Sequence, residues 1–242
     1  MPRLKRWLRD FSRRHGWEIA RVTERTDLSA FVASLCHDKR INCVIDVGAN
    51  IGQFARELRI DGYRGHIFSF EPVSHAYAQL ERNSARDAAW LTFHHALGSA
   101  DAELPINVLA LDRLSSFLGP SAFGSQFFGK RFEVVRTETV PLKRLDAIFD
   151  ELVSRVDEPR VFLKIDTQGW DMEVLKGASG CIDRVEGILT EAALEFSYDG
   201  MTPMQDVVRH LEGLGFDLSA IFTVTRSEHR LVEADVVMVR RT

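Results

Sequence analysis

The chain has 242 residues, of which 45% are hydrophobic and 27% are charged, and its formal net charge is −4. This length allows one large domain or two small ones, and the composition excludes disordered, collagen-like and disulfide-stapled proteins. No apolar run approaches the roughly 18 residues of a membrane-spanning helix, and the charged N-terminus is unlike a signal peptide. Three cysteines without CxxC spacing support neither a disulfide framework nor a zinc site, so we expect a cytoplasmic protein.

The charge is unevenly distributed, because residues 1–25 carry +5 and the remainder of the chain carries −9. In the basic segment Leu4, Trp7, Leu8 and Phe11 follow helical spacing. The segment is either an amphipathic helix that contacts the inner face of a membrane or a lipid-linked substrate, or a capping helix that packs on the domain. The acidic remainder argues against nucleic acid as a partner, because phosphate binding needs a basic face.

A second helix is predicted from Asp27 or Ser29, so that residues 1–40 form a helical segment ahead of a single domain over 41–242. From residue 42 onward short apolar segments alternate with helices, a pattern typical of a mostly parallel sheet in an α/β fold. The predicted strands are 43–47, 66–70, 90–97, 161–165 and 187–194, with 216–224 and 234–241 as an antiparallel pair at the sheet edge. Five helices are predicted between them: one that ends near residue 62, one over 71–85, and three around 144–153, 171–176 and 201–215.

Residues 98–141 interrupt the alternation. Two extended segments predict a hairpin inserted after the third strand, and no convincing helix fits the Ser-, Gly- and Phe-rich stretch 115–130 between them. Its aromatic residues are expected either to line an acceptor pocket or to form the small core of the loop itself. These residues are Phe117, Phe123, Phe127, Phe128 and Phe132.

The strongest local motif is VIDVGANIG, in which a strand runs into a glycine turn and then into a helix. Gly48 can adopt the positive φ of a tight turn, and Gly52 lets the helix start close to the strand. Asn50 stands where the dinucleotide motif GxGxxG has glycine, and Asp46 places a negative charge where a diphosphate would lie. The turn therefore favours a cationic or zwitterionic ligand with hydroxyl groups over NAD.

Glu71 ends the second strand and is followed by Pro72. In doubly wound folds an acid at this place accepts hydrogen bonds from ribose hydroxyls. An acid here would also favour the start of the next helix, and the two interpretations are compatible. Together with Asp46 and the Gly48 turn, Glu71 predicts a nucleoside-binding site.

These motifs resemble the FkbM family of S-adenosylmethionine-dependent methyltransferases over about residues 41–241. The most specific of them is FLKIDTQGWDMEVLKGA (162–178), in which Gln168 replaces the acid of the usual KIDxEG motif. This resembles a KIDTQG subset, in which Glu191 and Tyr198 match a later E…Y pattern. The other matching segments are IDVGANIGQF (45–54), FEP (70–72), ALGSADAE (96–103), the pair Ser115 and Ser116, VPLKRLDAI (140–148) and EADVVMV (233–239).

The resemblance implies a class I methyltransferase fold, with a Rossmann-like sheet, and O-methylation, often of sugars or natural products. It also implies S-adenosylmethionine as the cofactor. The residues that it assigns to the cofactor are Asp46, Gly48, Asn50 and Gly52 around the methionine and ribose, Glu71 on the ribose diol, Pro72 near the adenine, and Ala96 and Leu97 flanking the adenine at the end of the third strand.

Three further residues are candidates for catalysis. Asp166 ends the fourth strand at the ligand-binding edge of the sheet and is the candidate base, because a sugar hydroxyl is a poor nucleophile at neutral pH. Lys164 faces the same side of the strand, where it either shifts the charge balance of Asp166 or forms a salt bridge. Glu191 ends the fifth strand and contacts acceptor hydroxyls, or holds Mg²⁺ together with Asp166; two acids alone are a weak metal signal, so no metal ligands are assigned.

The sequence thus predicts methylation of a hydroxyl, most of all on a sugar of a glycolipid, polysaccharide or secondary metabolite. The acceptor is a hydroxylated small molecule or a lipid-linked molecule, which the basic start of the chain favours. Alternatives are an N- or C-methyltransferase on the same fold, since the fold does not determine the acceptor, and a cofactor-binding module without catalysis.

Overall fold

The computed structural model describes residues 27–241. The helix expected over residues 1–25, and the membrane contact expected of it, lie outside these described residues. The predicted second helix is α2 (Leu28–Asp38), and the side chain of Asp27 caps its start by accepting from the Ala30 amide at 3.2 Å. The buried side chains Val32 and Cys36 of this helix share a core cluster with Val44 and Phe162.

The main sheet has seven strands in the order β3-β2-β1-β7-β8-β10-β9. Its first five strands run parallel, and β10 runs antiparallel between β8 and β9. The predicted mostly parallel α/β sheet with an antiparallel pair at one edge is confirmed, with β9 outermost and β10 as the reversed strand. The strands are β1 (Cys43–Val47), β2 (His66–Phe70), β3 (Trp90–Phe93), β7 (Val161–Ile165), β8 (Val185–Ala193), β9 (Phe216–Ser227) and β10 (Arg230–Arg240).

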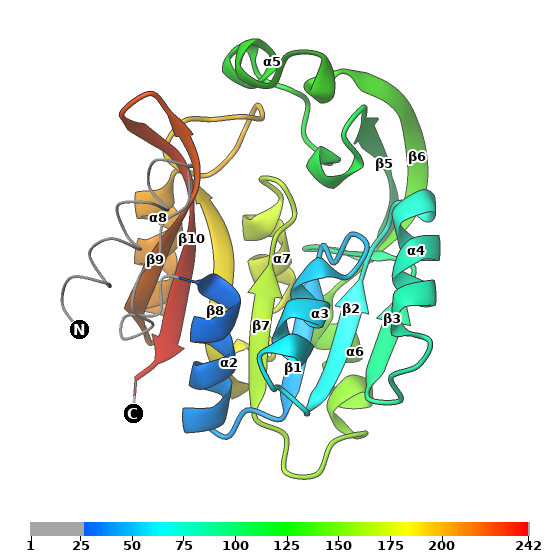
Figure 1. Cartoon of the computed structure of the whole chain (residues 1–242), viewed down its shortest axis with the longest axis vertical. Helices are drawn as coiled ribbons and strands as arrows, with labels where there is room; N and C mark the ends of the chain where they lie inside the picture. Colours follow the sequence, from blue (N-terminus) through cyan, green and yellow to red (C-terminus); the bar gives the residue numbers. More distant parts are fainter. Residues whose placement is uncertain (1–26, 242) are drawn as a thin grey trace, which may run out of the picture.

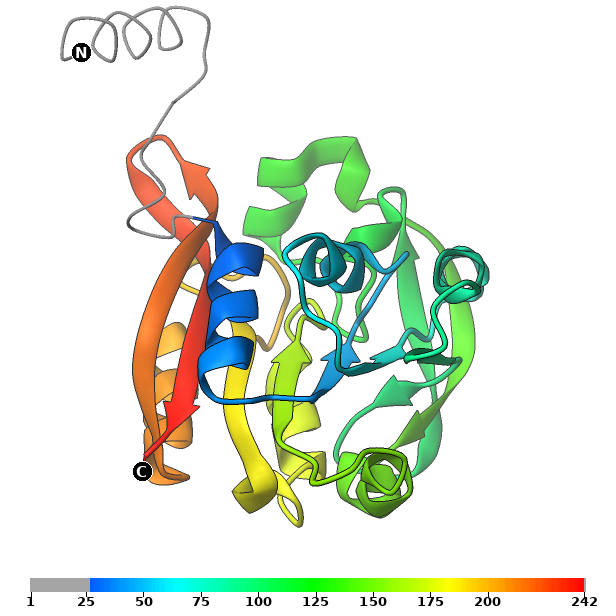
Figure 2. The ribbon, with the colours of Figure 1, turned by 60° about the horizontal axis from the view of Figure 1, so that its bottom comes forward.

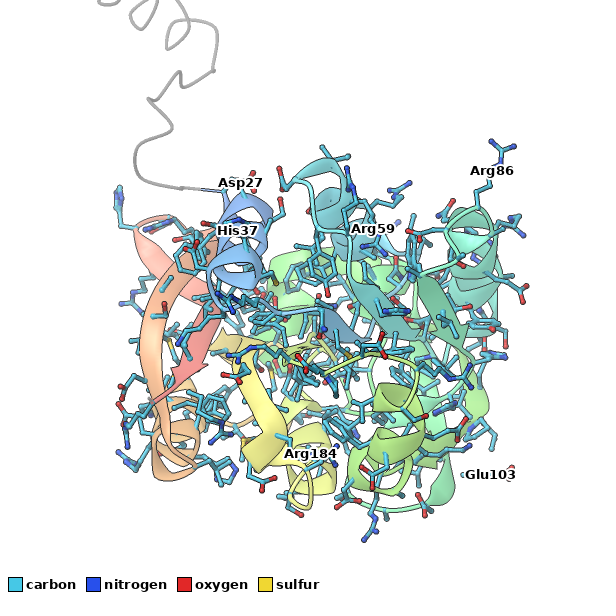
Figure 3. All side chains as sticks on the ribbon, turned by 90° about the horizontal axis from the view of Figure 1, so that it is seen from below. Asp27, His37, Arg59, Arg86, Glu103 and Arg184 are labelled. Carbon is cyan, nitrogen blue, oxygen red and sulfur yellow. The ribbon has the colours of Figure 1, made fainter. Side chains whose placement is uncertain are left out.

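Helices cover both faces of this sheet. Figure 3 looks along the strands from below and shows α2, α3 and α4 on one side, where Asp27, Arg59 and Arg86 are labelled, and α6, α7 and α8 on the other. The remaining helices of these two layers are α3 (Gln53–Ile60), α4 (Ser74–Ser84), α6 (Leu145–Val153), α7 (Asp171–Gly177) and α8 (Met204–Gly213).

Alternation along the central strands explains why both faces are covered. Ile45 and Leu163 pack into the core beneath α6, α7 and α8, whereas Val44 and Phe162 pack beneath α2, α3 and α4. Successive side chains of a strand point to opposite faces, so a strand that is apolar throughout must be buried on both. Asp46 and Lys164 follow the same alternation and therefore point toward the α3 face, inside the core rather than at its edge.

The inserted segment, residues 98–141, builds most of a second sheet of order β4-β6-β5. The predicted hairpin is present as β5 (Ala102–Leu109) paired antiparallel with β6 (Val134–Lys143). The predicted third strand is shorter than expected, because the chain leaves the main sheet after Phe93. The next two residues in strand form, β4 (Ala96–Leu97), pair with β6 instead.

The expectation that residues 115–130 contain no helix is wrong. Helix α5 (Ala122–Phe128) lies beyond the carboxyl ends of the strands in both Figures 1 and 2, between the 3₁₀ turns Asp112–Leu114 and Gly129–Phe132. The hydroxyl of Ser121 caps its first turn by accepting from the Gly124 amide at 2.9 Å. Glycine is a weak helix former, so the cap and aromatic packing, rather than propensity, explain this helix.

Candidate active site

A cavity of about 600 Å³ opens at the carboxyl ends of β1, β2, β7 and β8, and residues of the inserted segment form its opposite wall. Ligands of open α/β sheets bind at this edge, and a cavity of this volume is in the usual range for small-molecule sites. Nine of the eleven residues singled out in the sequence line it: Gly48, Asn50, Glu71, Pro72, Ala96, Leu97, Lys164, Asp166 and Glu191.

The other two, Asp46 and Gly52, lie behind the lining. The space beside Gly52 is taken by the Trp90 ring, which a Cβ at residue 52 would approach to 2.6 Å, so this glycine lets α3 begin close to the sheet. Asp46 is fully buried and accepts a hydrogen bond from Ser69 at 3.0 Å. Both positions act on the cavity through their neighbours, and direct contact of either with a cofactor stays a prediction.

The turn after β1 is built by backbone geometry. Gly48 has φ +72°, and a Cβ there would lie 1.9 Å from the carbonyl oxygen of Asp166, so only glycine lets the ends of β1 and β7 approach this closely. Asn50 also has a left-handed φ of +48°. This conformation directs the backbone N–H of Asn50 to the Glu71 carboxylate, to which it donates at 2.8 Å.

Glu71 is held from two sides at the end of β2. One carboxylate oxygen accepts from the Asn50 amide and the other from the Val73 amide, each at 2.8 Å. Burial raises the pKa of Glu71 to about 7, against the opposing effect of these two backbone donors. A carboxylate oxygen has a second lone pair, so Glu71 can still accept hydrogen bonds from a diol in the cavity.

Lys164 contacts Asp46 inside the sheet and Asp166 at the cavity. Its Nζ lies 3.0 Å from Asp46 Oδ1 and 3.6 Å from Asp166 Oδ2, and it donates to the Gly48 carbonyl at 2.9 Å. Burial disfavours the charge of Lys164, but the carboxylates of Asp46, Asp166 and Asp235 together outweigh this effect, and the pKa of the amine is raised. Lys164 thus forms the salt bridge that one of the two sequence interpretations expected, inside the core and beside Asp166. An effect of Lys164 on the charge balance of Asp166 stays a prediction.

Asp166 and Glu191 are brought together by a residue between them. The side-chain nitrogen of Gln168 donates to Asp166 Oδ1 at 2.9 Å and to Glu191 Oε2 at 3.1 Å. The side chain of Asp166 is 42% exposed and faces the cavity, whereas Glu191 is more enclosed. Burial, followed by repulsion from Asp166, raises the pKa of Glu191 well above its ordinary value.

Further carboxylates that the sequence did not single out line the same wall. Asp235 pairs across the strands with Glu191, and burial raises the pKa of Asp235 to about 7. Glu233 lies two residues away on β10 and accepts from the Ser197 hydroxyl at 2.7 Å. Asp235 lies in the predicted strand 234–241 and Glu233 directly precedes it, so their spacing of two residues was the available signal that both share one face. The register that sets Asp235 opposite Glu191 could not be predicted from the sequence.

Two of the five aromatic residues of the inserted segment line the cavity, and others form a small core, so both expectations are met in part. Phe117 and Phe128 face the cavity. Phe132 packs against Tyr198 with ring centres 4.8 Å apart. The Tyr198 hydroxyl donates to the Leu114 carbonyl at 2.5 Å, which fastens the inserted segment to the segment after β8.

No group of three or more His, Cys, Asp and Glu side chains within residues 27–241 has the arrangement of a metal site. In the same part of the chain no helix is long and apolar enough to cross a membrane.

The chain has the Rossmann-like fold of class I methyltransferases. An rRNA methylase from Streptococcus thermophilus has the same fold with a TM-score of 0.50 at 10% identity, over 92% of this chain and 100% of that one. The magnesium protoporphyrin IX methyltransferase of Synechocystis PCC 6803 aligns with a TM-score of 0.49 at 11% identity, over 89% of this chain and 78% of that one.

The model of the Methyltransferase FkbM domain matches residues 46–218, and the chain belongs to this family of methyltransferases. A curated relative is the methyltransferase sdnD of Sordaria araneosa. It is 26% identical over 199 residues, which is 73% of this chain and 74% of the relative. The predicted family and the predicted enzyme class are thereby confirmed, while the KIDTQG subset stays a prediction.

Proposed function

We propose that this enzyme transfers the methyl group of S-adenosylmethionine to a hydroxyl, on a sugar of a glycolipid or polysaccharide or on a secondary metabolite. The observation that carries the proposal is Asp166. Its carboxylate faces the cavity while Lys164 and Gln168 hold it from behind, at 3.6 Å and 2.9 Å. A fixed carboxylate beside the cofactor turn is what a hydroxyl nucleophile needs as a base.

The residues around the turn fit S-adenosylmethionine. Glu71 offers two carboxylate oxygens to a ribose diol, and two backbone amides keep it in place. Ala96 and Leu97, which are buried and line the cavity, suit the faces of an adenine ring. Gly48 and Asn50 would lie along the methionine part. The sulfonium of this cofactor supplies an electrophilic methyl group.

The protein's part in the reaction is alignment and proton removal. The acceptor oxygen attacks the methyl carbon in line with the departing sulfur, which keeps the electron pair of the broken C–S bond. Asp166 takes the proton from the hydroxyl as the O–C bond forms. Orientation of the two reactants can contribute about 7–11 kcal/mol. Lys164 keeps Asp166 in place, and Glu191 contacts the other hydroxyls of the acceptor.

A second candidate is methylation of an amine. The wall beyond the cofactor turn carries Asp166, Glu191, Glu233 and Asp235. Such a wall would also attract an ammonium group and orient it for N-methylation once it loses a proton. The same carboxylates suit an amino sugar that is methylated on oxygen, so product chemistry decides between the two candidates. We favour neither C-methylation nor a non-catalytic module, because a candidate base faces the cavity.

We also propose that the acceptor is a small molecule or is lipid-linked, and that the enzyme meets it in the cytoplasm, at the inner face of the membrane where the acceptor is lipid-linked. The acidic wall supports an acceptor other than nucleic acid, whose phosphates it would repel. The charge of +5 on residues 1–25 supports peripheral contact with an anionic surface.

The test uses methyl-labelled S-adenosylmethionine with panels of glycosides, amino sugars and hydroxylated metabolites. Label in an ether, identified by mass spectrometry of the product, is expected, whereas label exclusively on nitrogen would replace the first candidate by the second. Calorimetry should show binding of S-adenosylhomocysteine and none of NAD, and the reverse would contradict the cofactor assignment. Residues 1–25 are tested by deletion, which should weaken binding to anionic vesicles and keep turnover of a soluble acceptor.

A further inference from the structure

Gln168 lies at the junction of the two walls of the cavity. Its backbone has a left-handed φ of +53°, which long side chains adopt rarely and which the surrounding structure must hold in place. The Ser116 hydroxyl, from the inserted segment, donates to the Gln168 carbonyl at 2.7 Å. The hydroxyl of Tyr198 lies 3.1 Å from the side-chain oxygen Oε1. The backbone carbonyl of Gln168 is therefore fixed by a hydrogen bond, and its Oε1 shares the single Tyr198 O–H with the Leu114 carbonyl.

The other end of the amide faces two carboxylates. Nε2 carries two N–H groups, and it lies 2.9 Å from Asp166 Oδ1 and 3.1 Å from Glu191 Oε2. One N–H is thus available to each acid. Two carboxylates that converge on one point in a partly buried wall repel each other, and proteins commonly place a cation or a shared proton between them. Here a neutral group with two donors occupies that point.

An amide differs from a cation or a proton in one respect that matters for catalysis. It does not titrate in the physiological range and it does not dissociate. The oxygens of Asp166 and Glu191 that do not accept from Gln168 stay available to the cavity. The distance between the two acids is set by a covalently attached group, so it does not depend on a bound ion.

We propose that Gln168 is a positioning residue, whose side-chain amide occupies the place of a cation between Asp166 and Glu191 and holds both carboxylates toward the acceptor. This inference deepens the proposed function, because the two acids are those assigned to the hydroxyl acceptor. A carboxylate at residue 168 would instead make three acids converge on one point. Oxygen ligands from three carboxylates are what a divalent cation prefers.

The first experiment measures Mn²⁺ binding to the full-length chain saturated with S-adenosylhomocysteine, by electron paramagnetic resonance of the free ion. Wild type is compared with Gln168→Glu and with Gln168→Met, which matches glutamine in length but has no donors. Gln168→Glu should bind one Mn²⁺ at least about tenfold more tightly than the other two, the low end of what one group near a metal contributes. Equal affinity of all three, or wild-type binding as tight as that of Gln168→Glu, would overturn the proposal.

The second experiment needs no altered protein except for assignment, so it decides the matter even if Gln168→Glu does not fold. The side-chain amide protons of Gln168 are identified in nitrogen–proton spectra by their loss in Gln168→Met. Their exchange with solvent should be much slower than that of the exposed Gln126. Exchange as fast as that of Gln126 would show that the amide is not bonded to the two acids.

Neither measurement uses turnover. If no hydroxyl acceptor is found but Gln168→Glu gains Mn²⁺ and the Gln168 amide is protected, the proposed function fails and the positioning role of Gln168 stands. If a hydroxyl is methylated but the amide exchanges freely, the positioning role fails alone.

Discussion

The two halves of the cavity differ in how far the chain itself supplies partners for their buried carboxylates. In the half formed by β1 and β2, Asp46 is paired with Lys164 and Glu71 receives two backbone amides. In the half formed by β7, β8 and β10, Glu191 and Asp235 stand opposite each other on neighbouring strands. Burial raises the pKa of Glu71, Glu191 and Asp235 alike, but backbone donors oppose this at Glu71, whereas repulsion from Asp166 adds to it at Glu191 and Asp235.

The difference shows which half is complete without its ligand. The β1–β2 half has its charges compensated by the chain itself, as suits a cofactor that must bind in one fixed pose. The other half has more acids than donors, so a ligand with hydroxyl or ammonium protons would complete it. Like charges on facing strands cost stability, and such a cost is commonly retained at functional sites. The comparison therefore supports the proposal that the acceptor binds in the second half. Each variant below is directed at one half, although Lys164→Met also removes the contact of Lys164 with Asp166.

The largest effect is expected from Lys164→Met, which removes the compensating charge of the first half. Asp46, which is 0% exposed, would be left as a buried carboxylate without its lysine. Breaking such a pair from one side costs about 3–5 kcal/mol in the free energy of unfolding. Urea denaturation followed by circular dichroism measures the loss.

The control is the double variant with Asp46→Leu and Lys164→Met, since apolar residues in place of both partners are often tolerated. The double variant should recover most of the free energy of unfolding. It should not restore the placement of Asp166, because the contact with Lys164 is still missing. A loss below about 1 kcal/mol in the single variant, typical of an exposed pair, would show that the pair is not a buried structural element.

Asp166→Asn alters the second half at the point of chemistry. Asparagine keeps the shape and the hydrogen-bond reach of Asp166 but cannot take up the proton, so kcat should fall about 100-fold or more while S-adenosylhomocysteine affinity changes little. Steady-state kinetics and calorimetry separate the two quantities. A loss confined to KM would make Asp166 a binding residue. Complete inactivation of the wild type by EDTA, reversed by Mg²⁺, would show a metal-dependent step.

Glu71→Gln tests the first half through its ligand. A charge-assisted hydrogen bond contributes about 1.5–3 kcal/mol, so affinity for S-adenosylhomocysteine should fall by one such increment or more. Because burial raises the pKa of Glu71 to about 7 and ribose hydroxyls donate to the ionised form, wild-type affinity should rise as the pH increases from 6 to 8. Calorimetry at several pH values should show this slope, and Glu71→Gln should lack it. A wild-type affinity independent of pH would remove Glu71 from the ribose site.

Most of the fold and of the first half could be predicted from local sequence. Strands and helices alternate with clear periodicity, and the turn at Gly48 and the acid at Glu71 follow their strands at fixed intervals. The features that the sequence did not predict depend on contacts between residues far apart in the chain. That Asp46 compensates Lys164 depends on the parallel register of β1 and β7, which pairs these two residues directly. Helix α5 depends on a cap and on packing against Tyr198, neither of which is visible in the Gly- and Phe-rich stretch.

The second half was predicted least, because its acids come from three strands whose register only the fold reveals. Asp166 and Glu191 were found as strand ends. Asp235 was not, since it lies in the middle of a long strand, where an acid usually indicates an exposed face. Gln168 was noted as the loss of an acid, and the structure adds what the amide contributes in return, namely two donors between two carboxylates.

The smallest effect is expected from Asp235→Asn, and its sign distinguishes the two halves. The pKa of Asp235 is raised from 3.8 to about 7 in the folded chain, first by burial and then by Asp166. Between about pH 4 and 7 the folded chain therefore holds a proton that the unfolded chain has lost. Its contribution to stability is complete below about pH 4 and is lost as the pH rises through 7, with a slope of at most about 1.4 kcal/mol per pH unit.

Asparagine is neutral at every pH, so Asp235→Asn should gain stability relative to wild type when the pH is raised from 5 to 8. Urea denaturation at the two pH values measures this gain. The matched control is Asp217→Asn, which changes an exposed carboxylate on the neighbouring strand β9, paired with Arg241 at 2.6 Å. If the two variants respond alike, the acids of the second half are compensated as well as those of the first, and the case for an acceptor that supplies the missing protons is lost.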